Sequence, residues 1–191
     1  MKIILLRHGE TIWNKEGRLQ GCQDIPLSDT GAEQIRTTGA HLAASCIHID
    51  QILSSPLQRA RKSAEIIAHE LHHPTPNIVC SDYFLERGFG ECEGFTYEEA
   101  IAKYPDGNYP DMETLEELYA RAQTAIDYLE QNYRGQTILV ASHGAFIKSV
   151  LGVVTKGRIA YFDKDVWIEN GTYCLLEKTE ADWKVSIIPL Q

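Results

Sequence analysis

Two histidines in this chain share the same local setting, directly after an apolar run and directly before a glycine. His8-Gly9 follows the run at 3–6, and His143-Gly144 follows the run at 137–141. A short continuous apolar run is typical of a buried strand, and the glycine indicates where that strand stops. Because open α/β sheets bind ligands at the carboxyl ends of their strands, we expect the two imidazoles to meet at one edge.

Arginines accompany these histidines. Arg7 directly precedes His8, and Arg59 falls in the first turn of a helix that follows a third expected strand at 51–54. The helix expected after His143 directs free backbone N–H groups at the same edge, which favours an anion there. Each of these residues alone is also explained as a polar residue on an ordinary connection. Their combination indicates an anion site.

Composition restricts the class of protein. The chain has 191 residues, of which 43% are apolar, so we expect one domain over 1–191 with a substantial core. A net charge of -9 argues against nucleic acid or an anionic membrane as partner, while a few convergent arginines can still bind a small anion. No apolar run approaches the roughly 20 residues of a membrane span. The short N-terminal apolar run does not fit a signal peptide, and five cysteines without C-x-x-C indicate reduced thiols, so we expect a cytoplasmic protein.

Helix and strand signals alternate along the chain. They predict an α/β fold, a three-layer α/β/α sandwich with a mostly parallel central sheet. The strands are expected at 3–6, 51–54, 137–141, 172–177 and 184–188. The first helix is expected to begin after a Ser28 or Asp29 cap, and the second to begin after a Ser55 cap and to end near His72. A long helix is expected over 115–129, ended by Gly135, and a last helix after His143.

Six short motifs in order along the chain resemble one family. They are RHGET at 7–11 with Asn14, GRLQG at 17–21, DIPL at 24–27, SSPLQRA at 54–60, Glu86 with GECEG at 90–94, and SHG at 142–144. Together they span nearly the whole chain and resemble the histidine phosphatase superfamily, the phosphoglycerate-mutase-like proteins. The resemblance implies that fold and phosphoryl chemistry.

The implied chemistry passes through a phosphohistidine. Neutral His8 attacks phosphorus, and Arg7 and Arg59 hold the phosphoryl oxygens with forked hydrogen bonds that lysine cannot make. Their positive charges also disfavour the imidazolium form of His8 and so keep it nucleophilic. The resemblance implies no metal and no other cofactor.

Glu86 is the implied proton donor to the leaving oxygen and the later base for water. Without the resemblance, Glu91 and Glu93 compete for this role; the motif register selects Glu86. The resemblance implies that His143 is a further catalytic residue that completes the phosphate clamp, and contacts with a small phosphorylated substrate are expected from Asn14, Gln20, Gly21, Arg87 and Gly144. For Arg87, a surface ion pair is an equal alternative.

The family contains phosphatases and mutases, and both patterns occur here. Arg87 after Glu86 resembles the mutases, but Tyr97 stands where mutases carry a substrate-binding lysine, and the loop between Tyr104 and Thr114 is too short for their paired arginines. The chain also ends at Gln191 without the longer tail of mutases. Because a mutase needs a closing lid to exclude water, we expect a phosphatase. The alternatives are mutase-type transfer and an inactive module that binds a phosphorylated ligand.

Two other patterns need an interpretation. HELHH at 69–73 matches the H-E-x-x-H motif of zinc proteases, but it stands in the last turn before Pro74 without a clear third ligand, which favours a solvated helix end. Arg61 is expected on another helix face than Arg59, solvated or ion-paired. The variable cavity lining is expected mainly from 87–112, with Ile12, Gln20, Cys22 and Ala145.

Overall fold

A six-stranded sheet forms the centre of the described part of the protein. The computed structural model describes residues 1–73, 78–163, 165–180 and 182–188. The strands are β1 (Lys2–Arg7), β2 (Gln51–Ser54), β3 (Val79–Cys80), β4 (Thr137–Ser142), β5 (Tyr173–Lys178) and β6 (Trp183–Ile188), in the order β3-β2-β4-β1-β5-β6. The first four strands in this order pair in parallel, whereas β5 pairs antiparallel with β1 and β6 pairs antiparallel with β5. The expectation of a mostly parallel sheet is therefore confirmed.

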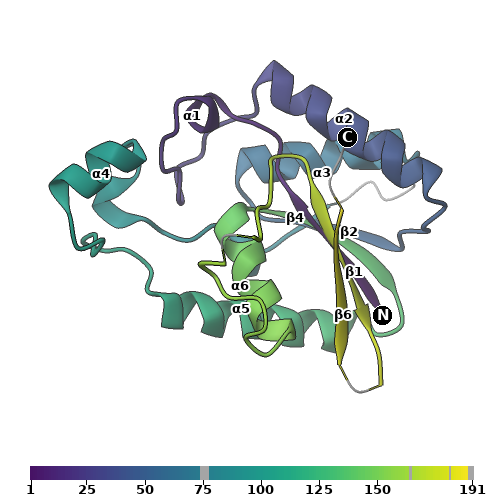
Figure 1. Ribbon diagram of the computed structural model, residues 1–191. Helices are drawn as coiled ribbons and strands as arrows, with labels where there is room; N and C mark the ends of the chain where they lie inside the picture. The colour runs from purple at the N-terminus through teal and green to yellow at the C-terminus, as the bar shows by residue number, and fades with distance from the viewer. Residues whose placement is uncertain (74–77, 164, 181, 189–191) are drawn as a thin grey trace.

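Helices cover both faces of the sheet. α2 (Asp29–Ala44) and α3 (Gln58–Glu70) lie on one face, and α5 (Leu115–Asn132) and α6 (Gly144–Val154) lie on the other (Figure 1). Successive side chains of a strand point to opposite faces. Accordingly, Ile4 of β1 packs in the core under α2 and α3, whereas its neighbour Ile3 packs in the core under α5 and α6. The predicted three-layer α/β/α sandwich is confirmed.

The sheet brings the two histidine segments together. β1 and β4 are parallel neighbours with Arg7 paired to Ser142. The backbone N–H of His8 donates to the carbonyl oxygen of Ser142 at 3.0 Å. His8 and His143 therefore leave adjacent strands at the same edge, as the sequence predicted.

Short elements surround that edge. They are α1 (Ile12–Lys15), the 3₁₀ turns Asp82–Phe84 and Gly90–Cys92, and α4 (Tyr97–Lys103). α4 begins with a capping box in which Thr96 and Glu99 satisfy each other's backbone N–H groups. The segment before it contacts the N-terminal region, since the N–H of Leu19 donates to the carbonyl of Phe95 at 2.9 Å.

The expected start of α3 is wrong. Its N-cap is Leu57, which contributes no side-chain hydrogen bond, and not Ser55. Instead Asp24 accepts from the backbone N–H of Gln58 at 2.6 Å and from its side chain at 2.9 Å. A carboxylate distant in sequence therefore satisfies the first turn. The other expected ends are close to the observed ones: α3 ends at Glu70, near His72, and α5 ends at Asn132, shortly before Gly135.

Within the described ranges, none of the helices combines the length and apolar character that a membrane crossing requires.

Candidate active site

His8 is buried at the carboxyl end of β1, with 2% of its surface exposed. Its Nδ1 lies 2.7 Å from the carbonyl oxygen of Gly9. Because a carbonyl only accepts, Nδ1 carries the hydrogen of the neutral ring and Nε2 keeps its lone pair. Burial, followed by the charges of Arg59 and Arg7, lowers the pKa of His8 well below 6.5. The imidazole is therefore held neutral with Nε2 as a nucleophile.

Two buried guanidinium groups flank this imidazole. Arg7 donates through Nη1 to the carbonyl of Ile168. Arg59 donates to the carbonyl oxygens of Gln23 at 2.6 Å and Gly21 at 2.8 Å. Burial lowers the pKa of both arginines, yet a guanidinium remains charged at neutral pH. Backbone carbonyls thus fix the orientation of both positive groups.

His143 completes this group at the end of β4. Its ring centroid lies 5.1 Å from that of His8, and its Nε2 lies 2.9 Å from the hydroxyl of Ser55. Burial, then Arg59 and His8, lower the pKa of His143 well below 6.5. The two imidazoles meet at one edge, as expected.

Unsatisfied donors gather at this edge. In the described part of the chain, four buried side-chain polar atoms have no hydrogen-bond partner, and three of them are Nε of Arg7, Nε of Arg59 and Nδ1 of His143. A buried donor without a partner costs about 1–3 kcal/mol. Three such atoms around one nucleophile fit the oxygens of a bound phosphoryl group.

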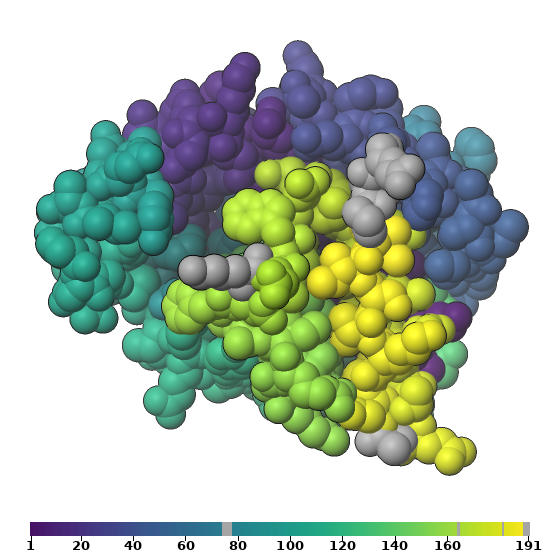
Figure 2. Space-filling view, in the orientation of Figure 1, coloured from purple at the N-terminus to yellow at the C-terminus, as the bar shows by residue number. Residues whose placement is uncertain are grey.

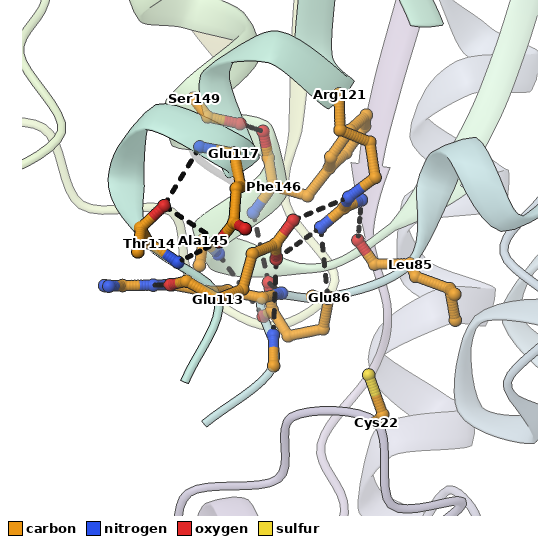
Figure 3. A network of polar contacts seen from close by, with 12 residues as sticks. Cys22, Leu85, Glu86, Glu113, Thr114, Glu117, Arg121, Ala145, Phe146 and Ser149 are labelled. Carbon is orange, nitrogen blue, oxygen red and sulfur yellow. Dashed lines mark hydrogen bonds and ion pairs between the residues drawn. The ribbon is translucent and has the colours of Figure 1, made fainter. Parts of the chain in front are cut away.

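Glu86 lies in the same cavity and is bound by the start of α6. Its carboxylate accepts from the backbone N–H groups of Phe146 at 3.0 Å, Ala145 at 3.3 Å and Arg87 at 2.9 Å (Figure 3). The backbone N–H groups that we expected to favour an anion at this helix terminus are therefore occupied by the carboxyl oxygens of Glu86. Its two competitors, Glu91 and Glu93, form their contacts elsewhere.

Glu91 accepts from the hydroxyl of Tyr104 at 2.7 Å and pairs with Lys103. Glu93 accepts from the backbone N–H of Cys22 at 2.9 Å and of Phe89 at 3.1 Å. Glu86, by contrast, lines the cavity with His8. The geometry favours Glu86 as the carboxylate that can exchange a proton with a ligand.

Two amides lie on the wall of the cavity. The Oδ1 of Asn14 accepts from the backbone of Thr11 at 3.1 Å and from the side chain of Asn170 at 3.3 Å. The Oε1 of Gln20 accepts from the hydroxyl of Thr11 at 3.0 Å. Since both oxygens are used in these bonds, the NH₂ groups of Asn14 and Gln20 are the ends available to donate to a ligand.

Comparison with known proteins agrees with this arrangement. The model of the histidine phosphatase superfamily (branch 1) matches residues 3–189. This chain belongs to that superfamily. It is 39% identical over 183 residues to the uncharacterized phosphatase PhoE of Bacillus subtilis, a match that covers 96% of this chain and 91% of PhoE.

Solved structures of histidine phosphatase relatives share the fold. YhfR of Bacillus stearothermophilus has a TM-score of 0.86 at 23% identity, covering 97% of this chain and 95% of that one. A phosphoserine phosphatase mutant from Entamoeba histolytica, in complex with phosphoserine, has a TM-score of 0.81 at 28% identity, with 97% and 95% covered.

The cavity of this histidine phosphatase has a volume of about 730 Å³. Figure 2 shows the surface hollowed where the N-terminal segment, the region of α4 and the loop after α6 meet. The sequence did not predict most of the wall that α6 and the loop after it contribute, because we expected the lining mainly from 87–112. That wall is formed by Lys148, Tyr161, Phe162, Asp163, Trp167 and Ile168.

Of three further residues expected to contact a substrate, two line the cavity and one does not. Gly144 and Gly21 line the cavity. Among the described residues, Arg87 is not part of the lining; it is 7% exposed, and its guanidinium carbon lies over the rings of Phe89 and Tyr161, 5.9 and 5.5 Å from their centroids. Its Nε donates to the carbonyl of Glu113. The surface ion-pair alternative is therefore wrong, since Arg87 is buried against two aromatic residues of the cavity lining.

The zinc-like HELHH segment lies outside this cavity. α3 ends at Glu70, His69 pairs with Glu70 at 3.3 Å, and His73 lies 3.0 Å from the carbonyl of Ile49. Nowhere in the described ranges do three His, Cys, Asp or Glu side chains form a group that could hold a metal ion. Arg61 pairs with Glu65 at 3.3 Å, as expected for a solvated position.

Proposed function

We propose that this protein is a phosphomonoesterase that hydrolyses a small phosphorylated metabolite through a phosphohistidine on His8. The observation that carries the proposal is the neutral, buried His8 surrounded by unpartnered donors of Arg7, Arg59 and His143. A neutral nucleophile needs no deprotonation, and the donors offset the charge of the transferring oxygens. In enzymatic phosphoryl transfer, positioning of the reacting groups and electrostatic stabilisation supply most of the rate acceleration.

The reaction has two steps. In the first, Nε2 of His8 forms a bond to phosphorus while the ester P–O bond breaks, and protonated Glu86 gives its proton to the leaving alcohol. In the second, water attacks phosphorus, Glu86 takes a proton from that water, and the P–N bond breaks to release inorganic phosphate. The step then returns neutral His8 and protonated Glu86.

Hydrolysis is favoured over return of the phosphoryl group to a substrate. Three aromatic side chains that line the cavity are open to solvent: Tyr97 is 62%, Phe162 is 72% and Trp167 is 69% exposed. Water therefore has access to a phosphohistidine, which a mutase must prevent. The names of PhoE and of the phosphoserine phosphatase also support a phosphatase.

Release of inorganic phosphate from p-nitrophenyl phosphate tests the proposal. His8→Ala should abolish it, whereas His48→Ala, at a side chain that is 88% exposed, should leave it unchanged. A phosphorylated substrate labelled at phosphorus should label the wild-type chain transiently at His8. Interconversion of 3- and 2-phosphoglycerate without phosphate release would establish a mutase, and binding without turnover would establish an inactive module.

A panel of phosphoglycerates, phosphoserine, sugar phosphates and a phosphopeptide identifies the substrate class. Because the cavity of about 730 Å³ far exceeds a phosphoryl group, it has room for the alcohol part of a metabolite. We place this reaction in the cytoplasm, a compartment in which thiols stay reduced, since all five cysteines of the chain are free.

A further inference from the structure

Arg121 of α5 uses three of its five N–H groups on the segment that carries Glu86 and the other two on Glu113. Nη1 donates to the carbonyls of Leu85 at 2.8 Å and Tyr83 at 3.2 Å, and Nη2 donates to the carbonyl of Glu86 at 3.2 Å. The remaining two N–H groups, on Nε and Nη2, donate to Glu113 at 2.9 and 2.8 Å (Figure 3). A guanidinium has five N–H donors, so this one is saturated.

The segment held in this way lacks regular structure. After the 3₁₀ turn Asp82–Phe84, residues 85–88 belong to no helix or strand. Carbonyls in such a segment need partners from elsewhere, because no ladder supplies them. Arg121 provides partners for two of them, Leu85 and Glu86, and also for Tyr83 in the preceding turn, and thereby fixes the backbone on both sides of the Glu86 Cα.

Glu113 holds the other end of the segment. Its carboxylate forms a forked ion pair with Arg121 and accepts from the N–H of Gly88 at 3.3 Å. Its backbone N–H donates to the carbonyl of Gly88 at 2.9 Å. The pair is mostly buried, with 21% of the Arg121 side chain and 19% of the Glu113 side chain exposed.

We propose that Arg121 and Glu113 are positioning residues that hold Glu86 where it can protonate the leaving oxygen. This inference rests on the proposed function. The start of α6 binds the carboxylate of Glu86, while Arg121 and Glu113 fix its main chain, so both ends of the side chain are set. Proton transfer requires hydrogen-bond geometry, and a displacement of about 1 Å costs on the order of 10²-fold in rate.

The leaving group distinguishes positioning from general stability. Phenyl phosphate needs a proton donor because phenolate leaves poorly, whereas p-nitrophenolate leaves without one. Both have similar size, and kcat/KM reports only steps up to loss of the leaving group. We expect Arg121→Gln to lower kcat/KM on the order of 10²-fold for phenyl phosphate and less than about 10-fold for p-nitrophenyl phosphate.

A double-mutant cycle tests whether Arg121 acts through Glu86. Glu86→Gln alone should lower kcat/KM for phenyl phosphate by about 10²–10⁴-fold. In that background, Arg121→Gln should cost less than about 3-fold, because the proton donor is already gone. Glu113→Gln should show the same leaving-group selectivity as Arg121→Gln.

Matched variants keep the test decisive. Arg61→Gln removes an exposed guanidinium that pairs with Glu65, and it should leave kcat/KM unchanged for both phosphates. If Arg121→Gln does not fold, Arg121→Lys and Glu113→Gln, with folding checked by thermal unfolding, carry the comparison. Equal losses on both phosphates, or full additivity with Glu86→Gln, would overturn the inference. Absence of leaving-group selectivity in Glu86→Gln itself would instead overturn the acid role of Glu86.

Discussion

The hydroxyl of Ser55, just after β2, lies 2.9 Å from Nε2 of His143, just after β4, and both residues are fully buried. The same hydroxyl accepts from the backbone N–H of Leu57 at 3.3 Å, so its own hydrogen is available for Nε2. The hydrogen of the neutral ring then resides on Nδ1, the buried atom without a protein partner. Ser55 thus sets the tautomer of His143 that leaves Nδ1 as a donor, the role that the proposed reaction needs toward a phosphoryl oxygen.

Ser55→Ala should therefore lower kcat/KM by about 10-fold, the equivalent of one lost hydrogen bond. The imidazole of His143 loses the contact that sets its tautomer, while the other phosphate donors remain. Steady-state kinetics with p-nitrophenyl phosphate measure the change. Ser45→Ala, at the exposed end of α2, is the control and should behave as the wild type. Equal kinetics for the two variants would contradict the orienting role.

The ionisation of His8 should depend on Arg59. Burial, then Arg59 and Arg7, hold the pKa of His8 well below 6.5, so the ring stays neutral as the pH falls through that value. Arg59→Gln removes one cationic neighbour and should raise the pKa of His8. NMR titration of the histidine ring protons measures this directly, without the contribution of the substrate's own ionisation. A His8 resonance that titrates identically in both proteins would rule out the electrostatic explanation.

Stability should also fall in mild acid. His8 and His143 have lowered pKa values in the folded state, whereas the unfolded chain takes up these protons near pH 6.5. Below pH 6.5 the unfolded state therefore binds more protons, and the free energy of unfolding falls by up to about 1.4 kcal/mol per pH unit for each histidine. Above pH 6.5 both states hold the two histidines neutral, so none of this free energy of unfolding is lost.

Urea unfolding at several pH values between 7 and 5 measures this dependence. His143→Gln should reduce the slope of the free energy against pH, because one of the two protons is no longer taken up on unfolding. A slope that is the same in the variant and in the wild type would show that other groups cause the acid sensitivity.

The centre of the site could be predicted because its signals are local. Apolar runs at 3–6 and 137–141 became β1 and β4, and each carries a histidine at its end. Parallel pairing of two such strands brings the histidines together whatever the rest of the chain does. Glu86 was selected over Glu91 and Glu93 only by the register of the family resemblance, and the structure places it in the same cavity.

The periphery could not be predicted because long-range contacts decide it. Asp24 satisfies the first turn of α3, which leaves Ser55 for His143, and no pattern within 54–60 indicates this. The cavity wall around Tyr161 and Trp167 lies on an irregular segment without periodicity. α4 is different: the capping box of Thr96 and Glu99 is a local signal in the sequence that is sufficient to predict the start of this helix.

Removal of metal ions should leave the activity unchanged. The chemistry proposed for His8 uses arginines and a glutamate, and the HELHH segment lies outside the cavity at the end of α3. Assays before and after treatment with a chelator, with and without added zinc, measure the effect. His69→Ala should also keep wild-type kinetics. A loss of activity that zinc restores would instead assign a metal to this phosphatase.

Gly9→Ala should destabilise the protein and misplace His8. A Cβ at Gly9 would lie 2.2 Å from the carbonyl oxygen of Gly31, a backbone atom at the start of α2 that cannot rotate away. Overpacking of this kind costs about 1–3 kcal/mol. Since Gly9 also accepts from Nδ1 of His8, a shift of its backbone moves His8, the proposed nucleophile.

Thermal unfolding and kcat/KM measured on the same Gly9→Ala preparation check both effects. Gly88→Ala is the matched control for stability, because its Cβ would meet the nearest atom at 3.8 Å, an ordinary contact. We expect a lower melting temperature for Gly9→Ala than for Gly88→Ala, together with a loss of activity in the fraction that remains folded. A Gly9→Ala protein as stable and active as the wild type would mean that α2 can move away from β1 without disturbing His8.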